Sequence, residues 1–448
     1  MNATTFPGGA SAESAAMSPL TRFLRLFGDV RQGEGITVLL LLSNLLVMLA
    51  GYYLCKSARE PLILASGAEM KSYTAAGQAV LLMGFVPLYS WFASRVNRIK
   101  LLLGVSLFFM ANLQLFWLAG RMNLPYIGIA FFIWVGIFNN AVIAQFWSYG
   151  NDLFDKPTGE RLFPVIAIGA TLGSPLGAKF AEVLFRGGAS PYTLMQYAVV
   201  ALLISMGLYW TVERRVEKHG AVAEKPLTGG RNGFALILES KYLRDICLLL
   251  LVLNLVNTTG EYVLSRSVVQ HADTLAAADP AFDKAAYIGA FYASYLFWVG
   301  IIAVIIQAFV ASRLVKFFGM AGALFALPLV ALGAYGVVAL GAGLAVVRVA
   351  KTAENATDYS IMNVARQMLW LPTSREEKYK AKQAADTFIV RFGDVMSAIL
   401  VWIGTAQLSM GQRGFAMANL LLIAVWIALG YILLREYRHR TATKAAAA

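Results

Sequence analysis

The sequence predicts an all-α polytopic membrane protein, with 12 transmembrane helices in two six-helix bundles. Of its 448 residues, 58% are hydrophobic and only 14% are charged, and the mean hydropathy is +0.63. This apolar fraction exceeds the roughly 45–50% that is typical of soluble domains. The apolar residues come in blocks of roughly 20, the length that a helix needs to cross a bilayer. The blocks divide into six and six around a polar centre.

The predicted elements follow one another in two similar halves. Residues 1–17 lack the apolar core of a signal peptide and are predicted to form a tail. Residues 18–33 alternate apolar and basic side chains, which is typical of a helix lying on a membrane surface. The expected spans are 36–56, 73–94, 100–120, 125–150, 163–185 and 193–212, then 243–268, 284–311, 317–337, 341–370, 383–407 and 413–434. The predicted units are a tail and interfacial helix (1–33), a bundle (34–212), a cytoplasmic linker (213–240), a second bundle (241–436) and a cytoplasmic tail (437–448).

Loop charges predict the orientation. Basic residues gather in the tails, the linker and the even-numbered loops, among them Arg95, Lys100, Arg161 and Arg313. The opposite loops hold only Lys71, Arg121, Arg186, Lys284 and Arg413. Because cytoplasmic loops collect lysine and arginine, both termini are expected to lie in the cytoplasm. The membrane is expected to be a bacterial inner membrane. The same rule accounts for the net charge of +13 without a nucleic-acid partner.

Two short sequence matches relate the halves. Ala-Ser-Arg recurs at 93–95 and 311–313, each time between the second and third helix of its half, and Pro-Thr recurs at 157–158 and 372–373, after the fourth. Matching places in a six-plus-six pattern indicate parallel repeats. This is the architecture of the major facilitator superfamily, in which the substrate site lies near the membrane midplane between the halves.

The predicted tenth span carries a polar stripe. Ionisable residues inside spans are costly, and they usually line a cavity or pair with one another. At about 100° per residue, the polar residues of this span fall on an arc of roughly 100°; they are Arg348, Lys351, Asn355, Asp358, Tyr359 and Arg366. The stripe predicts a helix face on a wet cavity. The alternative is that the charges pair among themselves, Lys351 with Asn355 and Asp358.

The first span ends in a basic segment. Arg59-Glu60-Pro61 is expected to end or break the helix, because proline lacks the amide donor. A cation at a helix break suits an anionic ligand, and the alternative is an anchor at the membrane interface. Lys56 lies one turn before Arg59 on the same span.

The fourth and fifth spans carry two further features. Asn140, Trp147 and Asn151 share one face of the fourth span, and Trp147 could stack on a ring of a ligand, as aromatic side chains stack on bases, or belong to an interfacial aromatic belt. In the fifth span, the small residues Gly169, Gly173 and Gly177 predict close helix packing. Asp152 at the end of the fourth span could gate a cavity or pair with Arg161.

These patterns give two sets of candidate residues. The candidate substrate-binding residues are Lys56, Arg59, Asn140, Trp147, Asn151, Lys179, Arg348, Lys351, Asn355, Tyr359 and Arg366. The candidate coupling or gating residues are Glu60, Asp152, Asn257, Glu261, Glu354, Asp358, Asp386, Arg391 and Asp394. No sequence motif of an enzyme is present, and the three scattered histidines make a metal site improbable. We expect no cofactor, and a monomer in the lipid bilayer.

Three segments resemble the ATP:ADP antiporter (nucleotide transporter) family. Tyr52–Leu64, followed by Gly67-Ala68-Glu69, is similar to the signature of that family's first helix, with Lys56, Arg59 and Glu60 at its charged positions. Phe146–Ala170 and Lys378–Gly393 are similar to two further family motifs. The chain departs from the family pattern at Asn257, Gln367 and Asp394, where the family has Glu, Glu and Lys.

The resemblance implies a secondary transporter that works by alternating access, with an adenine nucleotide as its anionic substrate. Two alternatives remain open from the residues alone. One is a proton-coupled transporter of another organic anion or an amphiphile, with Glu261 and Asp394 among the candidate protonation sites. The other is a membrane receptor that transports nothing.

Overall fold

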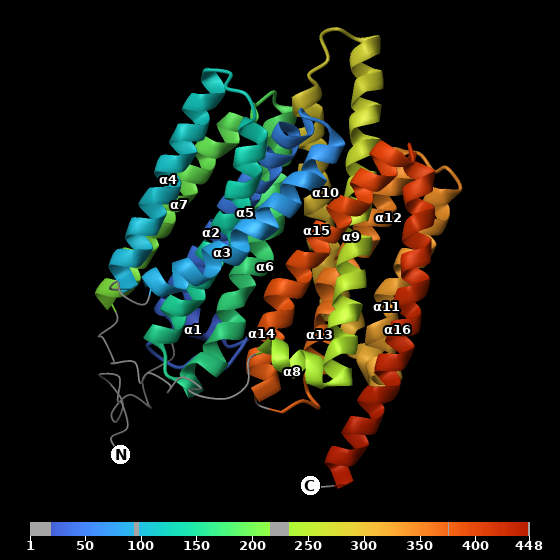
Figure 1. The fold of residues 1–448 in the computed structure, drawn as a ribbon. Helices are drawn as coiled ribbons and strands as arrows, with labels where there is room; N and C mark the ends of the chain where they lie inside the picture. Colours follow the sequence, from blue (N-terminus) through green and yellow to red (C-terminus); the bar gives the residue numbers. More distant parts are fainter. Residues whose placement is uncertain (1–18, 94–97, 216–232, 375, 447–448) are drawn as a thin grey trace.

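The structure is a computed structural model that describes residues 19–93, 98–215, 233–374 and 376–446. All regular structure in these residues is helical. In Figure 1 the blue-to-green helices of the first half lie on the left, and the yellow-to-red helices of the second half lie on the right. The predicted tail (1–17), Arg95 and most of the linker (213–240) fall outside the described residues, so the predicted unit boundaries stay predictions.

The helices are numbered along the chain, and η marks a π-helical segment. The first half contains α1 (Pro19–Leu24), α2 (Gly35–Leu64), α3 (Ala68–Ala93), α4 (Arg98–Arg121), α5 (Ile127–Leu153), α6 (Lys156–Arg186) and α7 (Pro191–Arg215). The second half contains α8 (Gly233–Glu239), α9 (Lys241–Ala278), α10 (Lys284–Ile305), η1 (Ile306–Ala311), α11 (Ser312–Ala339), α12 (Leu344–Thr357), η2 (Asp358–Met362), α13 (Asn363–Leu369), η3 (Glu377–Ala381), α14 (Lys382–Ala384), η4 (Ala385–Ile389), α15 (Val390–Trp402), η5 (Ile403–Gln407) and α16 (Gln412–Ala446).

The chain is a multi-pass membrane protein. Within the described ranges, 9 helical stretches are long and apolar enough to cross a membrane. One of them, Lys284–Ala339, contains both expected spans 284–311 and 317–337. The helix was expected to end at residue 311, but it continues past that residue into α11, and the backbone turns only at Gly319 (φ 60°, ψ −147°). Because α3 and α12 are not among the nine, the count of 12 spans stays a prediction.

The prediction that the first helix ends or breaks at Pro61 is wrong, because α2 continues to Leu64. The fixed φ of proline is compatible with a helix, and its missing amide removes only one hydrogen bond. Extensive packing of α2 against α6 and α7 offsets that loss. Gly67, at φ +107°, then turns the chain directly into α3, which begins well before the expected residue 73.

A strip of three glycines on α6 brings α6 and α2 together. A Cβ atom on Gly169, Gly173 or Gly177 would collide with backbone atoms of α2, at Leu42, Leu46 and Ala50 respectively. Small residues allow this close approach of two helix backbones. The predicted packing role of these residues, called the glycine strip below, is therefore confirmed.

The buried apolar side chains form two clusters that follow the two halves. One cluster comes almost entirely from residues 24–212 and the other almost entirely from residues 237–434. Each half therefore buries its own apolar core. Between the cores, the halves meet where α6 packs on α10 and where α3 packs on α15.

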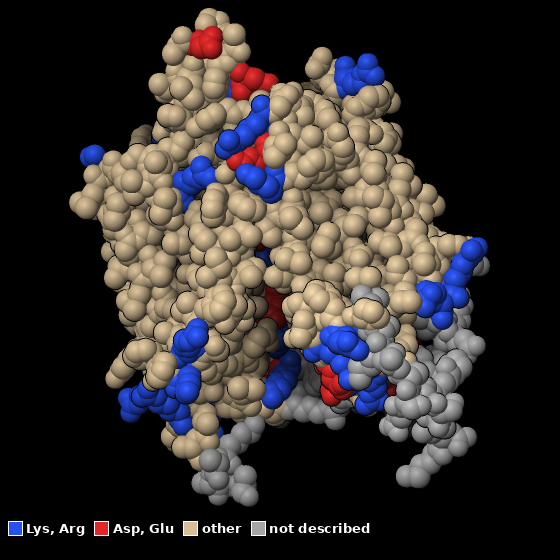
Figure 2. Space-filling view, turned by 180° about the vertical axis from the view of Figure 1, so that it is seen from behind, with Lys and Arg blue, Asp and Glu red and all other residues tan. Residues whose placement is uncertain are grey.

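Charged side chains gather at the two ends of the molecule, and the outer surface between the ends is largely uncharged. Figure 2 shows basic side chains at the lower end, a mixed charged group at the upper end, and a largely uncharged belt between them, crossed by a central groove. The helix α1 and the last turns of α16 both lie at the lower end in Figure 1. This arrangement is consistent with basic residues facing one side of a membrane.

The lower end of α6 anchors the segment before α2. Arg161 donates to the carbonyl of Asp29 at 2.6 Å and to the carboxylate of Glu34 at 2.9 Å. Asp155 caps α6 by accepting from the amide of Thr158 at 3.1 Å, and this hydrogen bond lowers the pKa of the Asp155 carboxyl. Glu34 and Asp29 are thus the acids that contact Arg161 in the structure.

Candidate functional site

A central cavity of about 250 Å³ lies between the two halves. Helices α2, α3 and α5 line it from the first half, and α9, α10, α12 and η2 line it from the second. The lining residues are Tyr52, Lys56, Arg59, Glu60, Lys71, Ser72, Ala75, Phe132, Asn257, Thr258, Glu261, Tyr262, Tyr292, Tyr295, Leu296, Asn355 and Tyr359. Charged groups and tyrosine rings thus make up more than half of this wall.

The charges of the first half pair around Glu60, on α2. Arg59 donates to the Glu60 carboxylate from Nε at 3.0 Å and also from its terminal nitrogen. The Lys71 ammonium on α3 lies 2.8 Å from the other carboxylate oxygen. Arg59 also lies over the ring of Phe132, with 4.2 Å between the guanidinium carbon and the ring centroid. Glu60, at 2% exposure, is thus a buried acid shared by two cations.

One ion pair crosses the cavity from the first half to the second. Lys71 Nζ on α3 lies 3.6 Å from the carboxylate of Glu261 on α9. A hydrogen bond of 3.1 Å from the Tyr262 hydroxyl to Glu69 adds a second link between the same two helices. Electrostatic contacts therefore connect the halves at this cavity.

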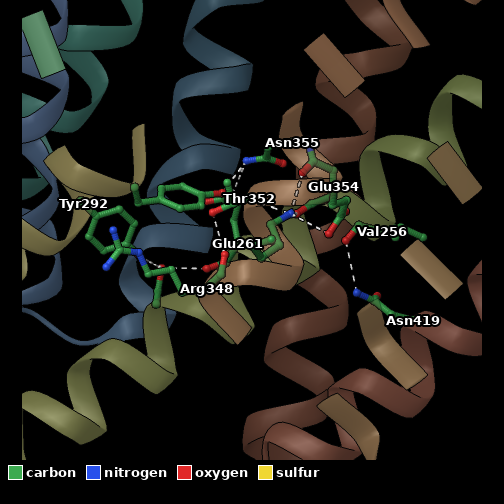
Figure 3. Close-up of polar contacts among 12 residues, drawn as sticks. Val256, Glu261, Tyr292, Arg348, Thr352, Glu354, Asn355 and Asn419 are labelled. Carbon is green, nitrogen blue, oxygen red and sulfur yellow. Dashed lines mark hydrogen bonds and ion pairs between the residues drawn. The ribbon is translucent and has the colours of Figure 1, made fainter. Parts of the chain in front are cut away.

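The charges of the second half continue the sequence of alternating signs. Lys351 Nζ lies 3.7 Å from Glu261 and 3.2 Å from Glu354, and it donates to Asn257 Oδ1 at 2.9 Å. The Tyr335 hydroxyl donates to Glu354 at 3.0 Å. Figure 3 shows Glu354 and Glu261 in this network of polar contacts.

Six residues thus form one row of alternating charge, called the ion chain below. Its members are Arg59, Glu60, Lys71, Glu261, Lys351 and Glu354. The side chains of Lys351 and Glu354 are each 3% exposed, whereas that of Glu261 is 26% exposed. The middle of the chain therefore faces the cavity, and its second-half end is buried.

Asn355 and Tyr295 fix the orientation of Glu261. The Asn355 amide donates to Glu261 Oε1 at 2.9 Å and to the Tyr295 hydroxyl at 2.6 Å, and that hydroxyl donates to Glu261 at 3.2 Å. These contacts are drawn in Figure 3. The carboxylate therefore has two neutral donors as well as two nearby ammonium groups.

Lys56 differs from the other cations of the cavity wall. Among the described residues it forms no ion pair with a carboxylate, and its ammonium lies 5.1 Å from the ring centroid of Tyr53. A cation at this distance from an aromatic ring gains a modest attraction from the ring. Lys56 is therefore the wall cation most available to an anionic ligand.

The structure brings seven of the candidate residues to the cavity wall. They are Lys56, Arg59, Glu60, Asn257, Glu261, Asn355 and Tyr359. Lys351 and Glu354 lie directly behind the wall, in the ion chain. The stripe of the tenth span is divided, because η2 changes the helical phase from Asp358 onward. π-Helical turns of this kind are frequent at functional sites.

The other candidate residues lie away from the cavity wall, and most of them form hydrogen bonds with other groups of the protein. Arg348 donates to Ser294 at 2.7 Å, Arg366 to Asp358 at 2.9 Å, Lys179 to Glu182 at 2.9 Å, Arg391 to Asp394 at 3.3 Å, and Asn140 to the carbonyl of Gly136 at 2.8 Å. Trp147 packs edge-on against Phe146 and Phe163. Asn151, Asp152 and Asp386 also lie outside the cavity lining.

Sequence reasoning missed Lys71 and assigned it to an outer loop, which is wrong. Lys71 is 8% exposed, and it lies in the first turn of α3 and in the cavity wall. The error came from starting the second span at residue 73. Gly67 and the acid Glu69 are ordinary signals of a helix start, and they place Lys71 inside the helix.

The chain is similar in sequence to curated ADP,ATP carrier proteins. It is 24% identical to ADP,ATP carrier protein 1 of Chlamydia pneumoniae, over 66% of this chain and 65% of that protein. It is 22% identical to the chloroplastic ADP,ATP carrier protein 1 of Arabidopsis thaliana, over 66% of this chain and 52% of that protein. The matches thus span less than two thirds of the length of these relatives.

The fold resembles those of solved transporters. The structure of peptide transporter POT in complex with sulfate has a TM-score of 0.64 at 11% identity, covering 94% of this chain and 99% of that chain. The nucleoside transporter NupG has a TM-score of 0.56 at 14% identity, covering 89% and 98%. At these identities the likeness shows the fold alone: the chain folds as these transporters do.

The family assignment comes from the sequence. Residues 126–437 match the TLC ATP/ADP transporter family. The matched region includes α5–α7, most of the second half and the cavity residues from Phe132 onward. The segment Tyr52–Leu64 lies before the matched region and is similar to the family's first helix by its motif. With more than half of its length matched, the chain belongs to the TLC ATP/ADP transporter family.

Proposed function

We propose that the protein is a secondary transporter that carries a nucleotide through the central cavity by alternating access. The observation that carries this proposal is the position of the cavity, whose wall is built from both halves. A rocking motion of one half against the other would expose such a site to each side in turn. The curated relatives, whose names describe ADP and ATP carriers, support a nucleotide as the substrate.

The link between the halves is suited to breaking and re-forming. Lys71 and Glu261 are 3.6 Å apart, and each has a second partner, Glu60 and Lys351 respectively. Separating the halves at this point therefore leaves neither charge alone. This arrangement avoids the large cost of isolating a buried ion.

The wall supplies groups for both parts of a nucleotide. Lys56 and Arg59 lie close together on α2, and cations of this kind form charge-assisted hydrogen bonds with phosphate oxygens. The rings of Tyr292, Tyr295 and Tyr359 line the cavity from the second half. Aromatic rings of this type stack on nucleobases without regard to sequence.

Exchange is the mode of transport that fits these charges. Within the described residues Lys56 has no carboxylate partner, so an empty carrier would have to reorient with this cation unpaired inside the membrane, which is costly. Bound phosphate removes that cost in both directions. The carrier would therefore reorient readily only when it is loaded.

Vesicle uptake tests this proposal. Purified protein in liposomes loaded with unlabelled ADP should take up labelled AMP, ADP or ATP faster than empty proteoliposomes do. Lys56→Gln should abolish this difference, and Lys179→Gln, outside the cavity, should preserve it. Uptake of no nucleotide would overturn the transport proposal, whereas equal uptake into loaded and empty vesicles would overturn exchange.

Proton coupling is a second candidate, and the position of Glu261 favours it. Glu261 is the most exposed acid of the ion chain, and it lies at the longest ion-pair distances, 3.6 and 3.7 Å. A proton on Glu261 would release Lys71 and so weaken the link between the halves. Uptake driven by a pH gradient and lost in Glu261→Gln would support coupling, and uptake unchanged by the gradient would exclude it.

We also propose that both termini lie in the cytoplasm of a bacterial cell. The support is the gathering of basic residues at the end that holds α1 and the last turns of α16. A fluorescent protein that folds only in the cytoplasm, fused after Ala448, should be bright. A dark fusion, with an active periplasmic reporter at the same position, would reverse the orientation.

A further inference from the structure

We propose that the cavity selects weakly charged nucleotides and binds a nucleoside monophosphate more tightly than a di- or triphosphate. This inference rests on the proposed nucleotide transport and names the substrate class of the same site. The observation behind it is that the acids of the cavity wall already neutralise most of its cations.

The net charge of the described cavity wall is +1. Its cations are Lys56, Arg59 and Lys71, and its acids are Glu60 and Glu261, so three positive charges face two negative ones. Glu60 pairs with Arg59 and Lys71, and Glu261 lies within 3.6 Å of Lys71. Only Lys56 has no acidic partner in this part of the chain.

Two oppositely charged pairs of residues behind the wall leave this balance unchanged. Behind Glu261, the buried cation Lys351 is matched by the buried acid Glu354. Beside Tyr262, the acid Glu69 is matched by Arg266, and both contact the Tyr262 hydroxyl. Each of these two pairs is neutral, so including them keeps the net charge of the wall at about one positive charge.

A phosphate monoester carries about −1.5 to −2 charges at pH 7. In a wall of +1, a nucleoside monophosphate therefore leaves an excess of about one negative charge or less. Each further phosphoryl group adds about one more negative charge, for which the described wall has no free cation. An uncompensated charge inside a membrane protein is expensive, so affinity should fall with each added phosphate.

The size of the cavity points the same way. Its volume of about 250 Å³ lies below the roughly 300–1,000 Å³ that is typical of small-molecule pockets. A shorter phosphate chain needs less widening of the site. Charge and volume, two independent properties of the wall, therefore favour the smallest nucleotide.

A binding series with the wild-type protein tests the inference directly. Purified protein in detergent would be titrated with AMP, ADP and ATP in the presence of a chelator, so that every phosphate keeps its full charge. We expect AMP to bind at least about tenfold more tightly than ATP, with ADP between them. Excess Mg²⁺ should narrow the gap, because the metal neutralises part of the triphosphate charge.

A matched pair of variants tests the cause. Glu60→Gln raises the net charge of the wall to +2 and should shift the preference toward ADP and ATP. Glu182→Gln makes the same substitution at another buried acid, which lies on α6 and pairs with Lys179 and Arg186 outside the cavity. The control should leave the ratio of AMP to ATP affinity unchanged.

The outcomes separate the two proposals. Tight binding of ATP, equal to or better than AMP without Mg²⁺, would overturn the charge selection and leave nucleotide transport intact. Binding of no nucleotide at all would overturn the proposed function and this inference with it. The wild-type series decides the question even if Glu60→Gln does not fold.

Discussion

The helices α2 and α12 both carry charges inside the membrane, but they are held in place by different means. The glycine strip of α6 fixes α2 by close backbone packing. The charges of α12 fix α12 itself, because Lys351 and Glu354 pair with each other and with groups on α9 and α11. Arg348 similarly bonds to Ser294 on α10.

The charges available to a ligand differ between the two helices in the same way. Backbone packing holds α2, so its cations Lys56 and Arg59 line the cavity and, among the described residues, do not bind a neighbouring helix through an ion pair. On α12 the cations are already used to hold helices together. The four predictions below test this division between binding charges and structural charges, starting with the largest expected effect.

Replacing Lys351 should destabilise the protein most. In Lys351→Met the carboxylate of Glu354 loses its cation while it remains buried, which costs about 3–5 kcal/mol in the free energy of unfolding. The matched control is Lys56→Met on α2, where no ion pair is broken and the loss should be below about 1 kcal/mol. Thermal unfolding of both variants in detergent measures this, and equal losses would contradict the division.

Adding a methyl group to the glycine strip should loosen α2. In Gly173→Ala the new Cβ collides with the backbone at Leu46, and such overpacking costs about 1–3 kcal/mol. Gly207→Ala on α7, where a Cβ meets nothing within 4 Å, should be neutral or slightly stabilising. A stable Gly173→Ala variant with a normal melting temperature would show that backbone contact does not hold α2.

Replacing Lys56 should reduce binding and leave stability nearly intact. In Lys56→Gln the wall loses the cation that has no acidic partner among the described residues, and nucleotide affinity should fall at least about tenfold, or 1.4 kcal/mol. The stabilisation of the protein by a fixed nucleotide concentration reports this affinity. An unchanged shift in melting temperature on adding nucleotide would place the phosphate elsewhere.

Replacing Lys179 should have the smallest effect. Its side chain is 50% exposed, and Glu182 keeps Arg186 as a second partner at 2.6 Å. Exposed ion pairs contribute about 0–1 kcal/mol, so Lys179→Gln should unfold and transport like the wild type. A loss of uptake without a loss of stability would extend the site to α6.

The sequence predicted the class of fold well, because membrane spans follow directly from hydropathy. It also predicted Lys56, Arg59, Glu261 and Asn355 as candidate functional residues, and these four line the cavity. A polar residue in an apolar span seldom lacks a polar environment. The packing of the glycine strip followed from residue size alone. Each of these inferences needed only local information.

Other features depended on tertiary contacts and could not be read from one helix. The stripe of the tenth span divided because η2 changes the helical phase, and because partners on α9, α10 and α11 bind Lys351, Arg348 and Glu354. Pro61 did not end α2, because packing against neighbouring helices compensates for the one backbone amide donor that proline lacks. Lys71 was assigned to a loop because the second span was expected to begin at residue 73, whereas α3 begins at Ala68.

Photocrosslinking tests most directly whether α2 and the tyrosine residues of the cavity wall form the substrate site. A photoreactive azido analogue of AMP, bound to the purified protein and illuminated, should label cavity residues such as Tyr52, Tyr292 or Tyr295. Unlabelled AMP should prevent the labelling, and Lys56→Gln should reduce it. Labelling confined to helices that do not line the cavity, such as α4 or α16, would contradict the account.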